Sequence, residues 1–405
     1  MKALELFAGA GGMALGLAAA GIRAAGLVEW DRWACDTLRH NVAAGHPLAA
    51  DWQVAEGDVR DFDVAALQDD IDLVTGGPPC QPFSMGGRHQ AFLDARDMFP
   101  ATIAIIAKLK PRAFILENVK GLTRASFANY YQYILHRLEY PEIESRPGEE
   151  WMAHFRRLQV ARSSGGFRQA LAYNVTATLV NAADYGVPQR RERVFIVGFR
   201  RDLDIEWSFP TPTHSEDALL WDQWISGDYW HRHGMAGQAR PTSPATQDNR
   251  LRALRGSLFP PELLPWRTTR DALLGLGDPE QEPELAIDHR FQPGARCYPG
   301  HTGSPVDAPA KTLKAGDHGV PGGENMLRRQ DGSVRYFSVR EAARIQTFPD
   351  GFSFHGSWSE TMRQLGNAVP MQLARTVGAS VARQLIGHSA LLQAQMLSGL
   401  ERRRS

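Results

Sequence analysis

Short apolar stretches alternate with helix-like segments over the first half of the chain, and this alternation limits the folds open to it most strongly. The segments between the stretches are alanine-rich or amphipathic. The apolar stretches are Leu4 to Phe7, Ala25 to Val28, Ile71 to Val74, Phe114 to Leu116 and Val194 to Phe199. The pattern predicts an α/β fold with a doubly wound, mainly parallel sheet.

The amino-acid composition changes near residue 202. From there on Pro, Gly and Trp are frequent, and helical periodicity is lost. We therefore expect a second, smaller, loop-rich domain. Regular helical patterns return at 339–349 and at 371–387, where a Gly is expected to end the helix. The predicted organisation is a catalytic and cofactor-binding domain at 1–201, a second domain with a hinge at 202–337, a segment at 338–387 that returns to the first domain, and a tail at 388–405.

Composition excludes several classes of protein. None of the apolar runs in the 405 residues approaches the roughly 20 residues needed to span a bilayer, so we expect a soluble, intracellular protein without a membrane partner. The three cysteines are scattered and offer neither a disulfide framework nor a metal site. Because 45 basic residues balance 45 acidic ones, a phosphate-binding face must come from local clusters.

A glycine-rich segment follows the first predicted strand, in "LELFAGAGGMALGLAAAG" at residues 4–21. Gly9, Gly11 and Gly12 allow the backbone to approach a ligand closely, and the helix that follows offers free N–H groups at its start. This suits a cofactor with an adenosine moiety. Taken alone, such a glycine turn is also common as a simple tight connection.

Three side chains at later strand ends complete an adenosine cradle. Glu29 can accept both hydroxyls of a ribose, Trp30 offers an apolar face to adenine, and Asp58 can accept from an exocyclic amine. The alternative is that the two acids cap loops and the tryptophan is part of the core. The joint occurrence of all three favours the cradle.

The segment "GGPPCQPFS" at 76–84 places Cys80 directly after a predicted buried strand. Ligands of doubly wound sheets bind at the carboxyl ends of the strands, and the strand at 112–119 delivers Glu117 and Asn118 to the same edge. A thiolate and a carboxyl group would then face one substrate beside the cofactor. An isolated free cysteine is more often an inert small hydrophobe.

These residues resemble the motifs of bacterial DNA (cytosine-5)-methyltransferases, which use S-adenosylmethionine. The resemblance extends over nearly the whole chain except residues 202–310, and Glu5 departs from it because the family usually has Asp there. The matching segments, in the family's order, are the glycine-rich start, "VEWD", "GDVRDF", "GGPPCQPFS", "LENVKGL", "YGVPQRRERVFIVGFR" and "RQLGNAVP". The resemblance implies a Rossmann-like, mixed but mainly parallel methyltransferase sheet and a smaller target-recognition domain.

The resemblance also implies the roles of the catalytic residues. The Cys80 thiolate adds to carbon 6 of cytosine, and Glu117, with a raised pKa in the closed site, protonates nitrogen 3. Asn118 orients Glu117, Arg193 contacts the carbonyl oxygen of the base, and Arg191 reaches the target phosphate. No residue is an evident base for removing the proton from carbon 5, and ordered water is our expectation.

The resemblance assigns a set of cofactor contacts, of which Phe99 could instead be a core residue. The expected cofactor contacts are Phe7, Gly9, Gly12, Glu29, Trp30, Asp58, Val59, Pro79, Phe99, Asn367 and Val369. The loop after Cys80 is expected to help flip the target base out of the duplex, with Ser84, Arg88 and Gln90 contacting DNA. A flexible connection without that role is the alternative.

The implied partner is double-stranded DNA, and a restriction endonuclease acting on the same site is a possible further one. We expect a monomer in the bacterial cytoplasm, associated with the nucleoid. Base readers are expected within 202–306, among polar residues between tryptophans that form a small core. The candidates are Arg232, His233, Gln238, Arg240, Gln247, Arg250, Arg252, Arg267 and Arg270. The alternatives are a tRNA cytosine-5 methyltransferase, a non-catalytic DNA-binding relative and, more remotely, a nicotinamide-dependent dehydrogenase.

Overall fold

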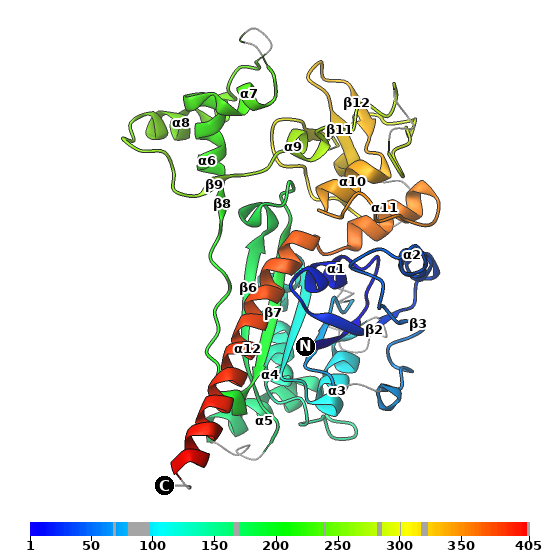
Figure 1. Ribbon diagram of the computed structural model, residues 1–405, viewed down its shortest axis with the longest axis vertical. Helices are drawn as coiled ribbons and strands as arrows, with labels where there is room; N and C mark the ends of the chain where they lie inside the picture. The colour runs from blue at the N-terminus through cyan, green and yellow to red at the C-terminus, as the bar shows by residue number, and fades with distance from the viewer. Residues whose placement is uncertain are drawn as a thin grey trace. The chain divides into compact units, whose positions relative to one another are not determined.

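The computed structural model separates the chain into two compact units, and each is described by itself. Unit 1 comprises Met1–Val180, Glu192–Pro210 and Ala374–Ser405, and unit 2 comprises Asn181–Arg191 and Thr211–Leu373 (Figure 1). The structure describes residues 1–67, 70–79, 97–164, 170–235, 237, 240–281, 286–299, 301–316 and 323–402.

A seven-stranded sheet in the order β3-β2-β1-β4-β5-β7-β6 organises unit 1. All the pairs among β1 to β5 are parallel, whereas β7 runs antiparallel to β5. The strands are β1 (Lys2–Leu6), β2 (Arg23–Glu29), β3 (Val54–Glu56), β4 (Leu73–Gly76), β5 (Ala113–Val119), β6 (Tyr173–Asn181) and β7 (Glu192–Arg200). The predicted mixed, mainly parallel doubly wound sheet is therefore confirmed.

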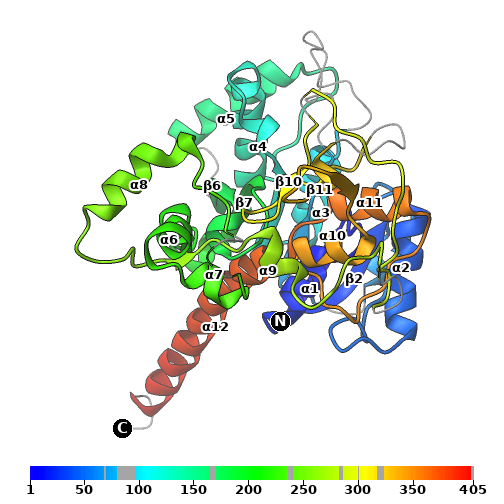
Figure 2. The ribbon, with the colours of Figure 1, turned by 90° about the horizontal axis from the view of Figure 1, so that it is seen from above.

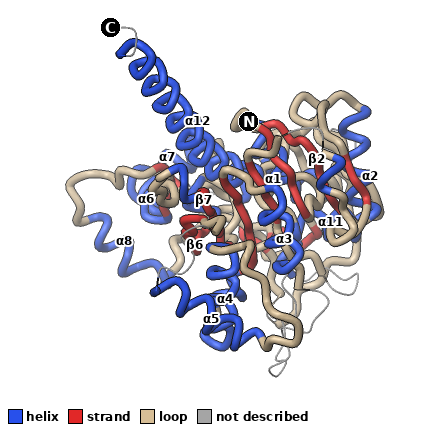
Figure 3. The backbone as a smooth tube through the Cα atoms, turned by 90° about the horizontal axis from the view of Figure 1, so that it is seen from below, coloured by secondary structure: helices blue, strands red, loops and turns tan. Residues whose placement is uncertain are grey.

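Helices cover both faces of this sheet, and Figure 3 draws its strands in red among them. The helices are α1 (Gly12–Ala19), α2 (Arg32–Ala43), α3 (Phe99–Leu109), α4 (Ala128–Glu139), α5 (Trp151–Ser164) and α12 (Met371–Arg402). β1 and β4 are neighbours in the sheet, although α1, β2, α2 and β3 separate them in the sequence. The strand order therefore reverses at this point, with β2 and β3 on one side of β1 and β4 on the other. Ligands of open α/β sheets bind at such a point.

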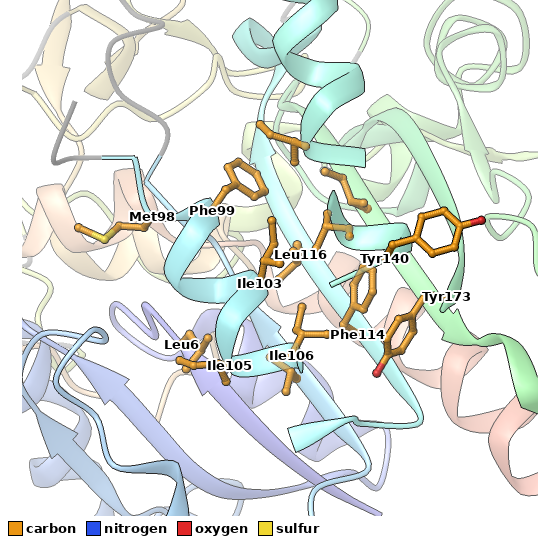
Figure 4. Close-up of a cluster of buried hydrophobic side chains, with 14 of the residues drawn as sticks. Leu6, Met98, Phe99, Ile103, Ile105, Ile106, Phe114, Leu116, Tyr140 and Tyr173 are labelled. Atoms are coloured by element: carbon orange, nitrogen blue, oxygen red, sulfur yellow. The ribbon is translucent and has the colours of Figure 1, made fainter. Parts of the chain in front are cut away.

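The core of unit 1 lies on the face of the sheet covered by α3 and α4. Leu4 and Leu6 of β1 alternate with residues of the other face, and they pack with Phe114 and Leu116 of β5 against Ile103 of α3 (Figure 4). This period of two is the strand signal seen in the sequence. On the opposite face α12 packs closely on α1, since a Cβ at Gly378 would lie 2.6 Å from Leu17 Cδ2.

Helix α12 does not end at Gly387, where the sequence predicted a stop, but continues to Arg402. A glycine inside a helix costs only about 1 kcal/mol relative to alanine. The residues around Gly387 include good helix formers such as Leu385, Ala390 and Leu391, which favour continuation of the helix. Among the described residues, no helix is both long and apolar enough to cross a membrane.

Unit 2 is built from short helices and two small sheets. The helices are α6 (Glu216–Trp221), α7 (Asp228–Arg232), α8 (Asp248–Arg255), α9 (Thr269–Leu273), α10 (Val339–Ile345) and α11 (Trp358–Asn367). Strands β8 (His214–Ser215) and β9 (Leu264–Pro265) form one sheet, and β10 (Ser304–Pro305), β11 (Met326–Arg328) and β12 (Val334–Tyr336) form the other. Figure 2 shows β10 and β11 of this second sheet beside α10.

Tryptophans form a small core in unit 2, as the sequence predicted. Trp230 and Trp266 are buried with Tyr229, and Trp224 packs against them. The Trp230 indole donates a 2.6 Å hydrogen bond to the carbonyl oxygen of Gln223, so its polar atom is satisfied inside the core. These rings stabilise the unit and are not free to stack on nucleic-acid bases.

Candidate active site

The glycine-rich loop between β1 and α1 is a tight turn with unusual backbone angles. Phe7 has φ 56°, Gly9 has φ 52° and Gly11 has φ 83°. A positive φ is easy for glycine but costs free energy for phenylalanine, and such strain is common where the backbone faces a ligand. A Cβ at Gly9 would meet no atom within 4 Å, so the loop leaves open space on that side.

The Glu29 carboxylate, at the end of β2, holds this loop in place. It accepts hydrogen bonds from the backbone N–H groups of Gly9 (2.7 Å), Trp30 (2.9 Å) and Asp31 (2.8 Å). Burial raises the pKa of Glu29, and these three hydrogen bonds lower it again in part. The predicted ribose acceptor therefore lies at the mouth of the loop and also has a structural role that the sequence did not suggest.

The other two parts of the predicted cradle are accessible. The Trp30 side chain is 70% exposed, which rules out the alternative that it is a core residue. Asp58 follows β3 and accepts from the backbone N–H (2.8 Å) and the Nε (2.9 Å) of Arg60. This contact lowers the pKa of Asp58. Val59, beside it, is buried.

Glu5 lies on β1 under the glycine loop and is only 2% exposed. Burial raises its pKa to about 8; the Ala14 backbone N–H, which hydrogen-bonds to it, lowers the pKa, and the Glu29 charge raises it. Among the described residues, neither Glu5 Oε2 nor Thr75 Oγ1 has a hydrogen-bond partner. Because Thr75 of β4 is the register partner of Glu5, two buried oxygens lie next to each other on one face at the switch between β1 and β4.

A buried ion pair joins the carboxyl end of β5 to the start of β7. Arg193 Nε lies 2.8 Å from Glu117 Oε1, and the two side chains are 11% and 8% exposed. Burial lowers the pKa of Arg193, and the Glu117 charge raises it again in part. A Cβ at Gly77 would lie 3.4 Å from Glu117 Oε2, so this carboxylate faces the segment that leads to Cys80.

Asn118 makes two contacts that the sequence did not predict. Its Nδ2 donates a 2.9 Å hydrogen bond to the Pro78 carbonyl, and its Oδ1 accepts from the Val119 backbone N–H. It therefore ties the chain after β4 to β5, and any orientation of Glu117 is indirect. The Met98 N–H donates to the Pro79 carbonyl at 3.1 Å, which brings the described residues on either side of 80–96 together. Cys80, Ser84, Arg88 and Gln90 lie outside the described residues.

Arg191 is fully buried in unit 2. The resemblance had instead predicted that it reaches the target phosphate. Its guanidinium donates to the carbonyl oxygens of Leu313 (3.0 Å), Gly366 (2.7 Å) and Ala368 (2.9 Å). These contacts join three segments of the unit. In this geometry the guanidinium presents no surface to a phosphate, and we propose a structural role for it instead.

The remaining predicted cofactor contacts differ in their surroundings. Phe99 is 1% exposed and belongs to the same core cluster as Leu6, which fits its alternative interpretation as a core residue. Gly12 begins α1 and is buried, whereas Pro79 is exposed. In unit 2, Asn367 is the exposed last residue of α11 and Val369 is buried.

The chain was compared with known proteins. The family model described as C-5 cytosine-specific DNA methylase matches residues 1–141, 166–226 and 300–383. The type II methyltransferase M.NgoMIV of Neisseria gonorrhoeae is 32% identical over 389 residues, which cover 94% of this chain and 97% of that protein. M.PspPI of a Psychrobacter strain is 32% identical over 390 residues, covering 94% of this chain and 79% of its own.

A solved structure supports the fold independently. The crystal structure of the Schizosaccharomyces pombe Dnmt2 methyltransferase superposes with a TM-score of 0.54 and 17% identity, over 95% of this chain and 99% of that one. At this level of identity, the likeness concerns the fold alone.

Proposed function

Because this chain belongs to the C-5 cytosine-specific DNA methylase family, we propose how its own residues methylate carbon 5 of cytosine in double-stranded DNA with S-adenosylmethionine. The observation that supports this proposal most directly is the Glu117–Arg193 pair. It lies beside Gly77, three residues before the only cysteine in the matching motif. A nucleophile, a proton donor and a cation can then act on one base.

The first step is addition of the Cys80 thiolate to the base. A bond forms between its sulfur and carbon 6, and the electron pair of the 5,6 double bond moves through the ring toward nitrogen 3. Glu117, whose carboxylate is ion-paired with Arg193 before the reaction, takes up a proton from water and passes it to nitrogen 3. We assign Arg193, whose Nε lies 2.8 Å from Glu117 Oε1, to donate a hydrogen bond to the carbonyl oxygen of the base. Loss of the proton from carbon 5, to water, and elimination of Cys80 complete the reaction after methylation.

The residues of the cradle fit S-adenosylmethionine, which supplies an electrophilic methyl group when bound. The open space beside Gly9 leaves room for the ligand, and the exposed Trp30 ring provides a surface for its adenine. Glu29 retains acceptor capacity for a ribose hydroxyl, since a carboxylate offers about four lone pairs and three are used by backbone donors. Asp58 would exchange its Arg60 contact for the adenine amine.

Access to the target requires the base to leave the stack, at a cost of a few kcal/mol. We assign that step to the loop after Cys80 with Ser84, Arg88 and Gln90, and we assign sequence choice to 202–337. The segment 338–387, predicted to return to the first domain, is divided: its residues up to Leu373 belong to unit 2, and those from Ala374 on belong to unit 1. A restriction endonuclease that cuts the same sequence is the counterpart that such a modification enzyme would protect against.

Bisulfite sequencing of DNA from a host that expresses the protein tests the activity. We expect methylated cytosines at one recurring sequence, and none when Cys80→Ala is expressed. Purified protein should transfer labelled methyl groups to duplex DNA and not to tRNA. Transfer to tRNA alone would replace the DNA substrate, and absence of transfer to either would leave a DNA-binding relative without catalysis.

A further inference from the structure

Four of the polar residues that the sequence offered as base readers are held by acids within unit 2. Arg232 pairs with Asp222 at 2.9 Å, and His233 lies 2.9 Å from Asp271. Arg270 pairs with Asp307 at 2.6 Å. Arg250 contacts both Glu216 and Asp217. Each would have to give up its acidic partner before it could contact a base. Among the described residues, Arg240, Arg252 and Arg267 are exposed, make no ion pair and stay candidates, and one further element of the unit offers an exposed cation as well.

That element is a short hairpin, defined here as Arg296–Pro299 together with His301–Gly303. The His301 N–H donates to the Tyr298 carbonyl at 2.8 Å, and the Tyr298 N–H donates back at 3.4 Å. The Tyr298 and His301 rings are stacked, with centroids 4.3 Å apart and planes 30° from parallel. The two rings are therefore organised before any ligand arrives.

The hairpin is anchored on the three-stranded sheet of unit 2. It continues directly into β10, which pairs with β11 through Ser304 and Leu327. Gly303 has φ 72°, and a Cβ there would lie 3.2 Å from the Arg328 backbone nitrogen, so only glycine fits this close approach without strain. Functional side chains on such a rigid support are positioned more precisely than those on a free loop.

The surface of the hairpin is basic, aromatic and accessible. Tyr298 is 46% exposed, and Arg296 is exposed as well. No acidic residue occurs between Asp288 and Asp307 in the sequence. The Glu324 carboxylate lies 3.7 Å from His301 Nδ1 and also pairs with Lys314 at 2.7 Å. The exposed Arg328 lies next to Gly303. In the described part of the chain, neither Arg296 nor Arg328 makes an ion pair, so both cations are available to an anionic partner.

We propose that the hairpin of 296–299 and 301–303 enters the major groove of duplex DNA and reads the target sequence there, with Arg296 contacting a guanine. The proposal rests on the DNA methyltransferase function proposed above. The major groove admits a two-stranded ribbon, and this turn, closed by the single Tyr298–His301 bridge, is no wider than one. The arginine fork matches the O6 and N7 acceptors of guanine. The Tyr298–His301 stack sets the shape of the ribbon, and Arg328 contacts a phosphate beside it. The family model leaves 227–299 unmatched, so Arg296 and Tyr298 lie outside the segments that it matches.

The test compares kcat/KM on duplexes with the target sequence and with each single base-pair change. Arg296→Ala should lose about 10- to 100-fold of discrimination at one G·C pair, and Arg296→Lys should restore part of it. Arg328→Ala should weaken binding to every duplex by the same factor and reduce the salt dependence of binding. The matched control is Arg156→Ala, an exposed arginine on helix α5 of unit 1, which should leave discrimination unchanged.

Unchanged discrimination in Arg296→Ala would overturn the assignment. So would an equal loss on every duplex, because Arg296 would then be a phosphate contact. The melting temperature of each variant separates these outcomes from misfolding. If the wild-type protein methylates no DNA, the proposed function itself fails, and that result is seen before any variant is made.

Discussion

Arg193 Nε lies 2.8 Å from Glu117 Oε1 although 75 residues separate the two along the chain. The contact depends on the antiparallel direction of β7. Its register pairs Arg193, near the start of β7, with Val119 at the end of β5. In a parallel strand the same arginine would lie at the opposite edge of the sheet, far from the carboxyl ends where the substrate binds.

Glu117→Gln should reduce kcat at least 100-fold because an amide cannot supply a proton to nitrogen 3. Single-turnover methyl transfer to a duplex with the target sequence measures this step. The control is Glu192→Gln, which removes an exposed carboxylate that pairs with Lys120 and should retain activity. A Glu117→Gln enzyme with the wild-type rate would show that another group is the acid.

Arg193→Ala should lower the free energy of unfolding by about 3 to 5 kcal/mol, since it leaves the Glu117 charge buried without this partner. Urea denaturation at neutral pH measures the loss. The double variant Arg193→Ala with Glu117→Gln should recover part of it, because the neutral amide is cheaper to bury. Equal stabilities of the single and double variants would mean that the pair is not coupled.

Glu29→Ala should weaken S-adenosylmethionine binding by roughly 1.5 to 3 kcal/mol, or about 10- to 150-fold, through loss of a charged acceptor. Titration calorimetry measures the dissociation constant. Glu56→Ala is the matched control because Glu56 is the register partner of Glu29 on β3 and carries an exposed carboxylate. Equal affinity of wild type and Glu29→Ala for S-adenosylmethionine would show that Glu29 only holds the glycine-rich loop and does not bind the cofactor.

Glu5 should make the protein less stable as the pH rises from about 5 to 8. The pKa of Glu5 is about 8 in the folded chain and 4.5 by reference. Between these values the folded state binds more protons than the unfolded state, so the free energy of unfolding falls with rising pH. The contribution of Glu5 to the free energy of unfolding is present in full below pH 4.5 and is lost as the pH rises through 8.

Glu5→Gln removes this titration. The free energy of unfolding of Glu5→Gln, relative to that of wild type, should be roughly 3 to 5 kcal/mol larger at pH 8 than at pH 5. Urea denaturation at both pH values measures this difference. Glu5→Asp, which restores the residue usual in the family, should keep a pH dependence. Identical slopes for Glu5→Gln and wild type would show that Glu5 does not titrate in this range.

The sequence by itself predicted the strands β1, β2, β4, β5 and β7 of the sheet and the residue types of the cofactor loop, whereas β6 was not predicted, and β3 was predicted only as a strand that ends at Asp58. The period-two stretch at β1, the glycines after it and Glu29 at the end of β2 are local signals, because strand alternation, turns and strand ends involve neighbouring residues. The tryptophan core of unit 2 was also predicted, since a large apolar ring is rarely left in water.

Tertiary structure alone decided which polar groups are available. Arg191 and Arg193 are two residues apart in the sequence and look alike there, yet the first is bonded to three backbone carbonyls and the second to Glu117. Likewise, Arg270 is paired within unit 2, and Arg296 is exposed on a hairpin. The partner of a charged side chain is chosen by contacts between distant segments, and a sequence pattern carries no record of them.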